Sequence, residues 1–395
     1  MKRILFVEDN EVLLELYGML LDGESDQWQT TLAPDGQAAM ALLRQSAFDV
    51  VVSDMQMPGM SGIELLSEVR KLHPQTSRII ISGVTDQAEA ADSLNCTHLF
   101  IPKPFDIKTL RSTLARISSL DAYLKDDKLR GLAGKMRSLP SFPLLYFEII
   151  REIESPSSSI QGIAKIVAKD RGITAKILQV ANSAAIGLAE RVNDPVEAVQ
   201  QLGMTTVRSL VLSAQVHSTF APGRLKHFSA DALWAHLMKC GDLARTLMRR
   251  ERAEFAESED AFTAGMLHDM GKLMLADSLP DEFEKALTLA AQEKIPLPAA
   301  ELEIFGATHA GLAAYLFGLW GLPAAIVEAV AFHHTPEKSE LKKFSALTAV
   351  HVANALAEES PAGSLNLDYL HQIGIAHRLD DWQDTAAELQ AEQFA

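Results

Sequence analysis

The feature that most constrains this chain is Asp54, which ends a continuous apolar run at residues 48–54. Comparable apolar runs occur earlier and later in the first 105 residues, at 4–7, 79–81 and 98–101. Short apolar runs of this kind, separated by segments of helical periodicity, predict buried parallel strands. The carboxyl ends of parallel strands meet at one edge of a sheet, where open α/β folds bind their ligands.

Reactive side chains follow these four runs, and the parallel arrangement predicts that they converge. They are Glu8, Asp9, Asp54, Ser82 and Lys103. Crowded carboxylates repel one another and favour an oxygen-ligated divalent cation, which here is Mg²⁺. With that repulsion screened, a carboxylate can attack a phosphoryl donor and hold the group as an aspartyl phosphate. The lysine would then bind a phosphoryl oxygen, and the serine hydroxyl would hydrogen-bond nearby.

Segments with helical periodicity lie between the predicted strands, at 11–21, 36–45, 62–72, 86–94 and from 106 onward. The resulting order is a strand and a helix repeated five times, which predicts an α/β doubly wound, flavodoxin-like fold. With its acid pair, Asp54 and lysine in this order, the stretch 1–120 resembles the receiver domain of bacterial two-component response regulators.

The resemblance implies roles for the residues at the strand ends. Asp54 would be the phosphoacceptor, and a sensor histidine kinase or phosphotransfer protein would be its donor. The implied magnesium ligands are Glu8, Asp9, Asp54 and the backbone carbonyl of Gln56.

Four further residues match positions that respond to phosphorylation in that family. Ser82 and Phe100 correspond to the hydroxyl and the aromatic residue that reorient together. Lys103 and Pro104 correspond to a Lys-Pro pair, usually joined by a cis bond, that aims the lysine into the pocket.

The periodicity becomes helical throughout from residue 143. Helices are predicted at 144–153, 160–169, 174–185, 196–201 and 205–218, followed by a helical block at 231–360. Breaks between them contain Pro, Ser, Gly and Asn. This part of the chain is therefore predicted to be all-α.

A His-Asp doublet, His268-Asp269, lies in an apolar helical segment of this block. An imidazole and a carboxylate presented together can bind one divalent metal, which would activate water for phosphoester hydrolysis. The segment resembles the HD superfamily of metal-dependent phosphohydrolases. The residues that would form such a site are His236, His268, Asp269, Lys272, His309, His333, His334 and Asn354.

The stretch from about 132 to 358 is more specifically similar to the HDOD domain, a signalling output related to the HD enzymes. The ordered matches include 139–143, 177–187, 198–203 and 320–323. Membership implies a binding or regulatory role rather than turnover. Asn354 stands where the HD pattern has an acid, and Gly-Tyr-Pro does not follow His334. Two interpretations remain open: a non-catalytic output that binds an unidentified protein, and a receiver-gated phosphohydrolase acting on a nucleotide or cyclic dinucleotide.

These patterns divide the chain into four parts. A receiver domain at 1–120 is followed by a helical linker at 121–138. The HDOD domain at 139–360 comprises a helical lobe at 139–220 and an HD-like lobe at 230–360. An acidic tail occupies 361–395.

Composition excludes several classes of function. The net charge of −16 and the lack of a basic cluster argue against binding to nucleic acid, and no apolar stretch is long enough for a membrane span. Two cysteines favour a cytoplasmic protein without a disulfide framework or a zinc site made of cysteines. A divalent metal in the HD-like lobe and a homodimer are left open.

Overall fold

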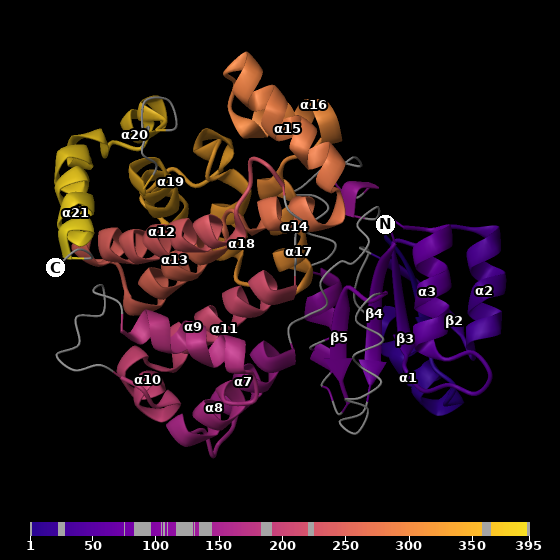
Figure 1. Cartoon of the computed structure of the whole chain (residues 1–395). Helices are drawn as coiled ribbons and strands as arrows, with labels where there is room; N and C mark the ends of the chain where they lie inside the picture. Colours follow the sequence, from indigo (N-terminus) through magenta and orange to yellow (C-terminus); the bar gives the residue numbers. More distant parts are fainter. Residues whose placement is uncertain are drawn as a thin grey trace. The chain divides into compact units, whose positions relative to one another are not determined.

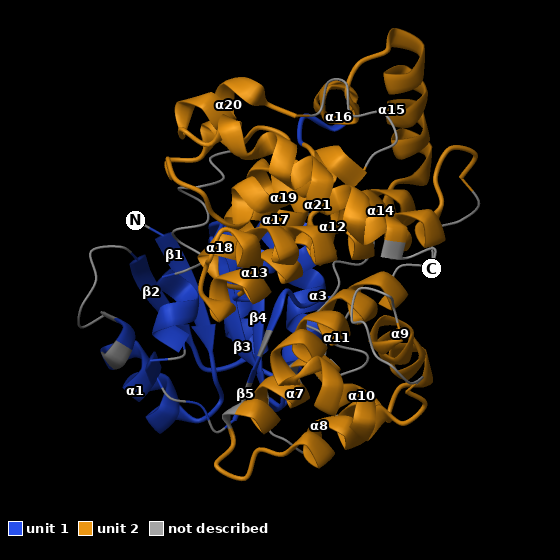
Figure 2. Cartoon of the chain, turned by 90° about the vertical axis from the view of Figure 1, so that its left-hand side faces the viewer, with its two compact units in different colours: residues 1–142, 305–307, 315–321 blue, residues 143–304, 308–314, 322–395 orange. Residues whose placement is uncertain are grey.

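The structure is a computed structural model of residues 1–395. It describes residues 2–22, 28–74, 76–82, 96–103, 105, 107–108, 110–115, 129, 131–133, 144–182, 192–219, 225–357 and 365–392. The chain separates into two compact units (Figure 2). Unit 1 contains residues 1–142, 305–307 and 315–321, and unit 2 contains residues 143–304, 308–314 and 322–395.

Unit 1 is built on a five-stranded sheet whose paired strands all run parallel, in the order β2-β1-β3-β4-β5. The strands are β1 (Lys2–Val7), β2 (Trp28–Ala33), β3 (Val50–Asp54), β4 (Ser77–Ser82) and β5 (Leu99–Pro102). The described helices between them are α1 (Glu11–Asp22), α2 (Gly36–Gln45) and α3 (Gly62–Leu72). This is the predicted doubly wound α/β fold, and β2 is a strand that no apolar run had marked.

Burial explains why the central strands form the core of this sheet. β3 is buried along its whole length, and Leu5, Phe6 and Val7 of β1 are fully buried. One core cluster joins residues of β1, β3 and β4 to the apolar sides of α2 and α3, which lie side by side in Figure 1. On α1, the Tyr17 ring packs against the Phe6 ring. The sheet is therefore rigid where its strand ends carry the predicted site.

Unit 2 is helical, as predicted. Its first helices are α7 (Leu144–Glu154), α8 (Ile160–Val167), α9 (Arg171–Ala181), α10 (Pro195–Leu202) and α11 (Met204–Thr219). They are followed by α12 (Ala230–Arg250), α13 (Phe255–Leu267), α14 (Met270–Ser278), α15 (Pro280–Glu293) and α16 (Leu297–Phe305). The remaining elements are α17 (His309–Leu319), α18 (Ala324–Phe332), η1 (Pro336–Lys338), α19 (Ala346–Ala357), α20 (Leu367–Gln372), η2 (Ala376–Arg378) and α21 (Leu379–Glu392). The last residue of α16 and residues 315–319 of α17 are assigned to unit 1.

Side-chain caps explain several of these helix starts. Ser159, Asp170, Asp194 and Ser229 each accept a backbone N–H from the first turn of the helix that follows. The prediction for α9 ran four residues beyond its end at Ala181, and residues 183–185 of that range lie outside the described residues.

Two glycines let α12 and α13 approach closely. A Cβ atom added to Gly265 would lie 2.7 Å from the Cα atom of Gly241, so a larger residue does not fit there. This close contact brings His236 on α12 near His268 at the end of α13.

The lengths and composition of the described helices bear on whether any could span a membrane. None is by itself both long and apolar enough to cross a bilayer, although α16 and α17, bent by 76° relative to each other, meet the length and composition criteria together.

Candidate functional site

The strand ends of unit 1 bring three carboxylates together. Glu8 and Asp9 follow β1, Asp54 ends β3, and one oxygen from each lies within 4.8 Å of the others. Glu8 is 2% exposed and Asp54 is 8% exposed, whereas Asp9 is exposed. Oxygen ligands grouped in this way suit Mg²⁺, which prefers carboxylates and water. These three residues fit the cation that the sequence predicts.

Lys103, just after β5, neutralises part of this acidic group. Its Nζ atom lies 3.0 Å from Glu8 Oε2 and 3.0 Å from Asp54 Oδ1. Burial alone would lower the pKa of Lys103, but its hydrogen bonds to Asp54 and Glu8 outweigh burial and raise that pKa. Burial raises the pKa of Glu8. The lysine is therefore an ammonium ion at neutral pH and is placed to move to a phosphoryl oxygen.

Local backbone contacts fix the position of Asp54. The Met55 N–H donates to Asp54 Oδ1 at 3.0 Å. A Cβ atom added to Gly62 would lie 2.0 Å from the Asp54 carbonyl oxygen, so only glycine fits at the start of α3. Ser61 and Glu64 form a capping box that begins this helix.

The remaining predicted receiver residues are only partly described. Gln56 is exposed two residues after Asp54. Phe100 and Ser82 occupy neighbouring strands, with Phe100 paired to Ile80 and Ser82 to Pro102, but their side chains lie outside the description. Pro104 also lies outside the described residues, as does nearly all of the predicted linker. The roles of these residues remain predictions.

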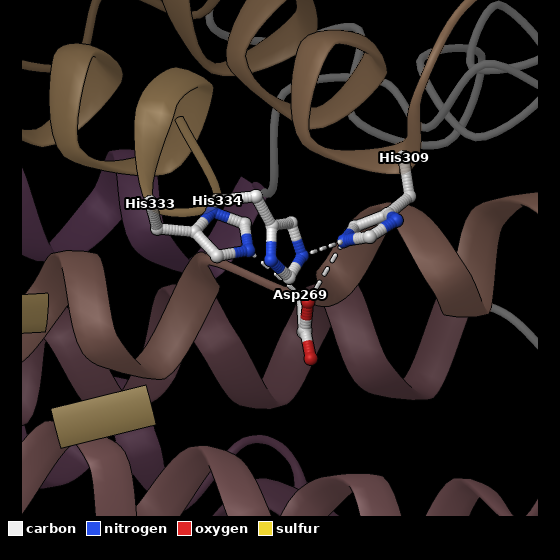
Figure 3. Close-up of side chains that lie close together, drawn as sticks. All are labelled: Asp269, His309, His333 and His334. Atoms are coloured by element: carbon white, nitrogen blue, oxygen red, sulfur yellow. Dashed lines mark hydrogen bonds and ion pairs between the residues drawn. The ribbon is translucent and has the colours of Figure 1, made fainter. Parts of the chain in front are cut away.

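A second group of polar side chains lies inside unit 2 around Asp269. This residue precedes α14 and is fully enclosed, with 1% of its surface exposed. Figure 3 shows the rings of His309, His333 and His334 gathered beside its carboxylate. Asp269 Oδ1 lies 2.9 Å from His309 Nε2 and 3.5 Å from His333 Nε2. The Nε2 atoms of His309 and His334 are 3.2 Å apart.

Hydrogen bonding shows why this group fits a cation. His333 Nδ1 lies 2.8 Å from the Val330 carbonyl oxygen, to which it donates, so a neutral ring presents the bare Nε2 toward Asp269. Burial lowers the pKa of His333, which favours that neutral ring. Neither His333 Nε2 nor Asp269 Oδ1 has a hydrogen-bond partner of normal geometry. Two buried acceptors that face each other need a donor or a cation beside them, which here is either a proton on His309 Nε2, 2.9 Å from Asp269 Oδ1, or a bound metal ion.

Glu301 on α16 supports His309 from behind. Its Oε2 atom lies 2.7 Å from His309 Nδ1 and accepts the His309 backbone N–H at 2.9 Å. Burial would lower the pKa of His309, but Glu301 and Asp269 raise it overall. Metal-binding histidines commonly donate their second ring nitrogen to a carboxylate in this way. Gly271 on α14 lets the backbone of His309 approach closely, since a Cβ atom there would lie 2.1 Å from the His309 carbonyl oxygen.

Lys272 pairs with the other oxygen of the Asp269 carboxylate, Oδ2. Burial would raise the pKa of Asp269, but Lys272 and the surrounding histidines hold it well below its usual value. Asp269 is therefore an anion, and its two oxygens face different groups of side chains.

The Oδ2 side of Asp269 faces His236 and His268, whose Nε2 atoms are 3.7 and 3.5 Å away. The two Nε2 atoms are 3.3 Å apart, and Asn354 Oδ1 lies 3.0 Å from the first and 3.3 Å from the second. Burial lowers the pKa of both histidines to about 4. Cys240 Sγ is also close, 3.4 Å from His236 Nε2.

All eight residues that the sequence suggested for the HD-like site thus lie in one connected cluster. Sequence reasoning missed Glu301 and Cys240. The spacing of Cys240, four residues after His236 on α12, could have indicated it, because such residues share a helix face. Glu301 carried no comparable signal, since its partner His309 lies on a different helix.

Comparison with known proteins supports the division of the chain into a receiver part and a helical HDOD part. The HDOD domain family matches residues 139–336, and the response regulator receiver domain family matches residues 4–115. A response regulator receiver protein of Anaeromyxobacter sp. is 35% identical over 105 residues, 26% of this chain. An uncharacterized protein of Treponema pallidum is 24% identical over 241 residues, 60% of this chain. The match covers 43% of each relative, less than half of its length.

Solved structures support the fold of the helical part. A Geobacter sulfurreducens HDOD domain protein has a TM-score of 0.51 at 21% identity and covers 68% of this chain and 99% of its own. A putative phosphohydrolase from Shewanella amazonensis has a TM-score of 0.53 at 22% identity and covers 68% and 97%. The parallel sheet, the helical unit and the two family matches lead to one conclusion. The chain belongs to the HDOD family, and its residues 4–115 match the response regulator receiver domain family.

Proposed function

We propose that Asp54 of this response regulator receives a phosphoryl group from a sensor histidine kinase or a phosphotransfer protein. The observation that carries the proposal is the position of Lys103, whose Nζ atom lies 3.0 Å from both Glu8 and Asp54. The ammonium group beside Asp54 can offset part of the negative charge that a phosphoryl group brings.

The chemistry follows from these neighbours. An Asp54 carboxylate oxygen forms a bond to phosphorus while the bond between phosphorus and the donor breaks, and the leaving group keeps the electron pair. Mg²⁺, held by Glu8, Asp9, Asp54 and the Gln56 carbonyl, would screen the repulsion between anions. Lys103 then transfers a hydrogen bond from the carboxylates to a phosphoryl oxygen.

The output proposed for the HDOD domain is binding of a protein partner, with a metal ion held at the cluster around Asp269. Asn354 contributes a neutral amide where an enzyme of the HD type has an acid, which weakens the case for turnover. The net charge of −16 makes a protein a more suitable partner than nucleic acid. We further place this function in the cytoplasm.

A second candidate function is metal-dependent phosphoester hydrolysis. It is favoured by one observation, the convergence of Asp269, His309, His333 and His334 into a group of potential metal ligands. A metal there could activate water. Assays of the full chain with Mn²⁺, Fe²⁺ or Mg²⁺ against cyclic dinucleotides and nucleoside phosphates distinguish this hydrolase function from partner binding. Turnover that Asp269→Asn abolishes would favour the enzyme.

Intact mass tests the phosphoacceptor. The full chain is incubated with a small acyl phosphate and Mg²⁺, and one phosphoryl adduct is expected on the wild type. Asp54→Asn should carry none, whereas the control Glu68→Gln, a partly exposed acid on α3, should match the wild type. Equal labelling of wild type and Asp54→Asn would refute the assignment.

A further inference from the structure

Lys176 on α9 lies among side chains from two other helices of unit 2. α9 and α11 lie side by side in Figure 1, and the Lys176 Nζ atom is 2.7 Å from Nδ1 of His217 on α11. The same Nζ atom is 3.9 Å from the centre of the Trp234 ring on α12. The Trp234 and His217 rings meet edge to face, with their centroids 5.1 Å apart. An imidazole and an indole therefore hold the lysine nitrogen in one position.

The hydrogen bonds of His217 define which of its ring nitrogens is basic. Its Nε2 atom lies 3.2 Å from the Ala230 carbonyl oxygen, which can only accept, so Nε2 carries the ring proton and donates it. Nδ1 is then the bare nitrogen, to which the Lys176 nitrogen donates. Burial and the positive charge of Lys176 lower the pKa of His217, so the ring is neutral at pH 7. A neutral imidazole in contact with an amine can accept a proton from it.

The surroundings of Lys176 favour the free amine over the ammonium ion. Burial lowers the pKa of Lys176 to about 8, although the negative charge of Asp231 opposes this shift. At pH 7 about one-tenth of a lysine with this pKa is free amine, whereas a lysine of ordinary pKa, near 10.4, is almost entirely protonated. A contact in which Trp234 only binds the ammonium ion would require the form that burial disfavours. The free amine is the nucleophilic form of lysine.

These groups have the arrangement of an activated nucleophile. An amine is in hydrogen-bond contact with a base, and a backbone carbonyl orients that base through its second nitrogen. Lys176 is only half-buried, so a small reagent can reach its nitrogen. The reaction that uses all three features is acyl transfer, because an amine that gains an acyl group must release a proton, and His217 Nδ1 is placed to take it.

We propose that Lys176 is a modification site that accepts a short acyl group from an acyl phosphate or an acyl thioester, with His217 as the base. The Lys176 nitrogen forms a bond to the acyl carbon while the bond from that carbon to the oxygen or sulfur of the donor breaks, and the leaving group keeps the electron pair. The N–H proton passes to His217 Nδ1 and then to the leaving group or solvent. The product is a neutral amide, which no longer carries the cost of a partly buried charge. Neither phosphorylation of Asp54 nor a metal at Asp269 is required for this reaction.

Peptide mass spectrometry of the acylated full chain tests the site. The protein is treated separately with acetyl phosphate and with an acetyl thioester, each isotope-labelled in the acetyl group so that only acyl transfer is followed. Near pH 7, Lys176 should react more than about tenfold faster than the exposed Lys165, because its free-amine fraction is high. Its rate should rise with pH and level off above about pH 9, one unit beyond its pKa of about 8. The donor that gives the faster reaction identifies the source of the acyl group.

The His217→Gln variant tests the base. Glutamine keeps an acceptor for the amine but cannot take up its proton, so the Lys176 rate on the high-pH plateau should fall more than about tenfold while the Lys165 rate stays the same. Comparing plateau rates removes the effect of any change in the Lys176 pKa. An unchanged plateau rate in His217→Gln, with the fold verified by circular dichroism, would overturn the role of His217. Equal rates of Lys176 and Lys165 in the wild type with both donors would overturn the site itself, and that comparison needs no variant.

Discussion

Lys103 Nζ lies 3.0 Å from Asp54 Oδ1, so the proposed phosphoacceptor is already paired with a cation before any phosphoryl group arrives. The same ammonium group contacts Glu8 at 3.0 Å, and it therefore occupies oxygens that Mg²⁺ would otherwise bind. In the proposed reaction, Mg²⁺ would compete with the lysine for these carboxylates until a phosphoryl group provided the lysine with a new acceptor.

Lys103→Met should lower the free energy of unfolding of the metal-free protein, and added Mg²⁺ should restore that free energy. Without the ammonium group, buried Glu8 faces Asp54 uncompensated, at a cost of about 1–2 kcal/mol. Mg²⁺ affinity should rise several-fold, because no side-chain cation competes. Thermal unfolding with and without Mg²⁺, together with calorimetric titration, measures both effects. Lys71→Met, on the exposed side of α3, is the matched control. Equal Mg²⁺ affinity in Lys103→Met and wild type would contradict the competition.

Glu301→Gln should weaken metal binding at the Asp269 cluster by about 10- to 100-fold, the usual effect of losing a residue that orients a metal ligand. Gln keeps the shape of the side chain but removes the charge beside His309 Nδ1. The exposed neighbour Glu303→Gln provides the control on the same helix. Zn²⁺ per chain and chelator competition are the measurements. Identical affinities in the two variants would show that Glu301 does not support a metal ligand.

Gly271→Ala should destabilise the helical unit by more than about 3 kcal/mol, because the new Cβ atom would lie 2.1 Å from the His309 carbonyl oxygen. Zn²⁺ binding should fall with it, since α14 and the start of α17 would separate. Gly172→Ala, whose Cβ atom would meet only the Asp170 side chain at 3.2 Å, should change stability little. Denaturant unfolding compares the two variants, and similar midpoints would contradict the tight contact.

The buried position of Lys176 predicts that the stability of the protein depends on pH in the alkaline range. Burial lowers its pKa from 10.5 to about 8, and its Nζ atom lies 3.9 Å from the centre of the Trp234 ring and 2.7 Å from His217 Nδ1. Between about pH 8 and pH 10.5, the unfolded chain binds more protons at Lys176 than the folded chain does. Lys176 therefore makes the free energy of unfolding rise with pH over this range. The cost of burying the ammonium group is fully present below pH 8.

The matching experiment compares Lys176→Met with the exposed Lys165→Met by urea unfolding from pH 7 to 10.5. The first variant should be more stable than wild type near pH 7, and its advantage should shrink as the pH rises. Lys165→Met should show no such trend. A constant difference between Lys176→Met and wild type across this range would mean that the lysine does not titrate as proposed.

The sequence predicted the strands of the sheet correctly where the buried positions are also filled by apolar residues. β1, β3, β4 and β5 were found because each is a short apolar run. β2 was missed because Trp28–Ala33 mixes buried ends with partly exposed threonines, which gives neither an apolar run nor a strict alternation. The predicted helix starts at 174 and 231 lie four and two residues after the observed N-caps of α9 and α12, Asp170 and Ser229.

The strand-end site was predictable from the parallel arrangement of the strands, whereas the full set of residues in the HD-like site was predictable only through resemblance. Nothing in the spacing of His236, His309 and His333 indicates that three separate helices bring them to Asp269. Cys240 was not considered for this cluster, because two cysteines cannot form a zinc site of cysteines. Its proximity to His268 depends on the Gly241 and Gly265 contact, which a sequence does not display.

We propose that phosphorylation of Asp54 changes the HDOD domain, and hydrogen exchange tests this coupling most directly. The full chain and Asp54→Asn are compared with and without beryllofluoride and Mg²⁺, with loading verified by mass or fluorescence. In the wild type, exchange should change in residues 106–150 and in helices of unit 2, and Asp54→Asn should show no change. Unaltered exchange throughout unit 2 with Asp54 fully loaded would contradict the account.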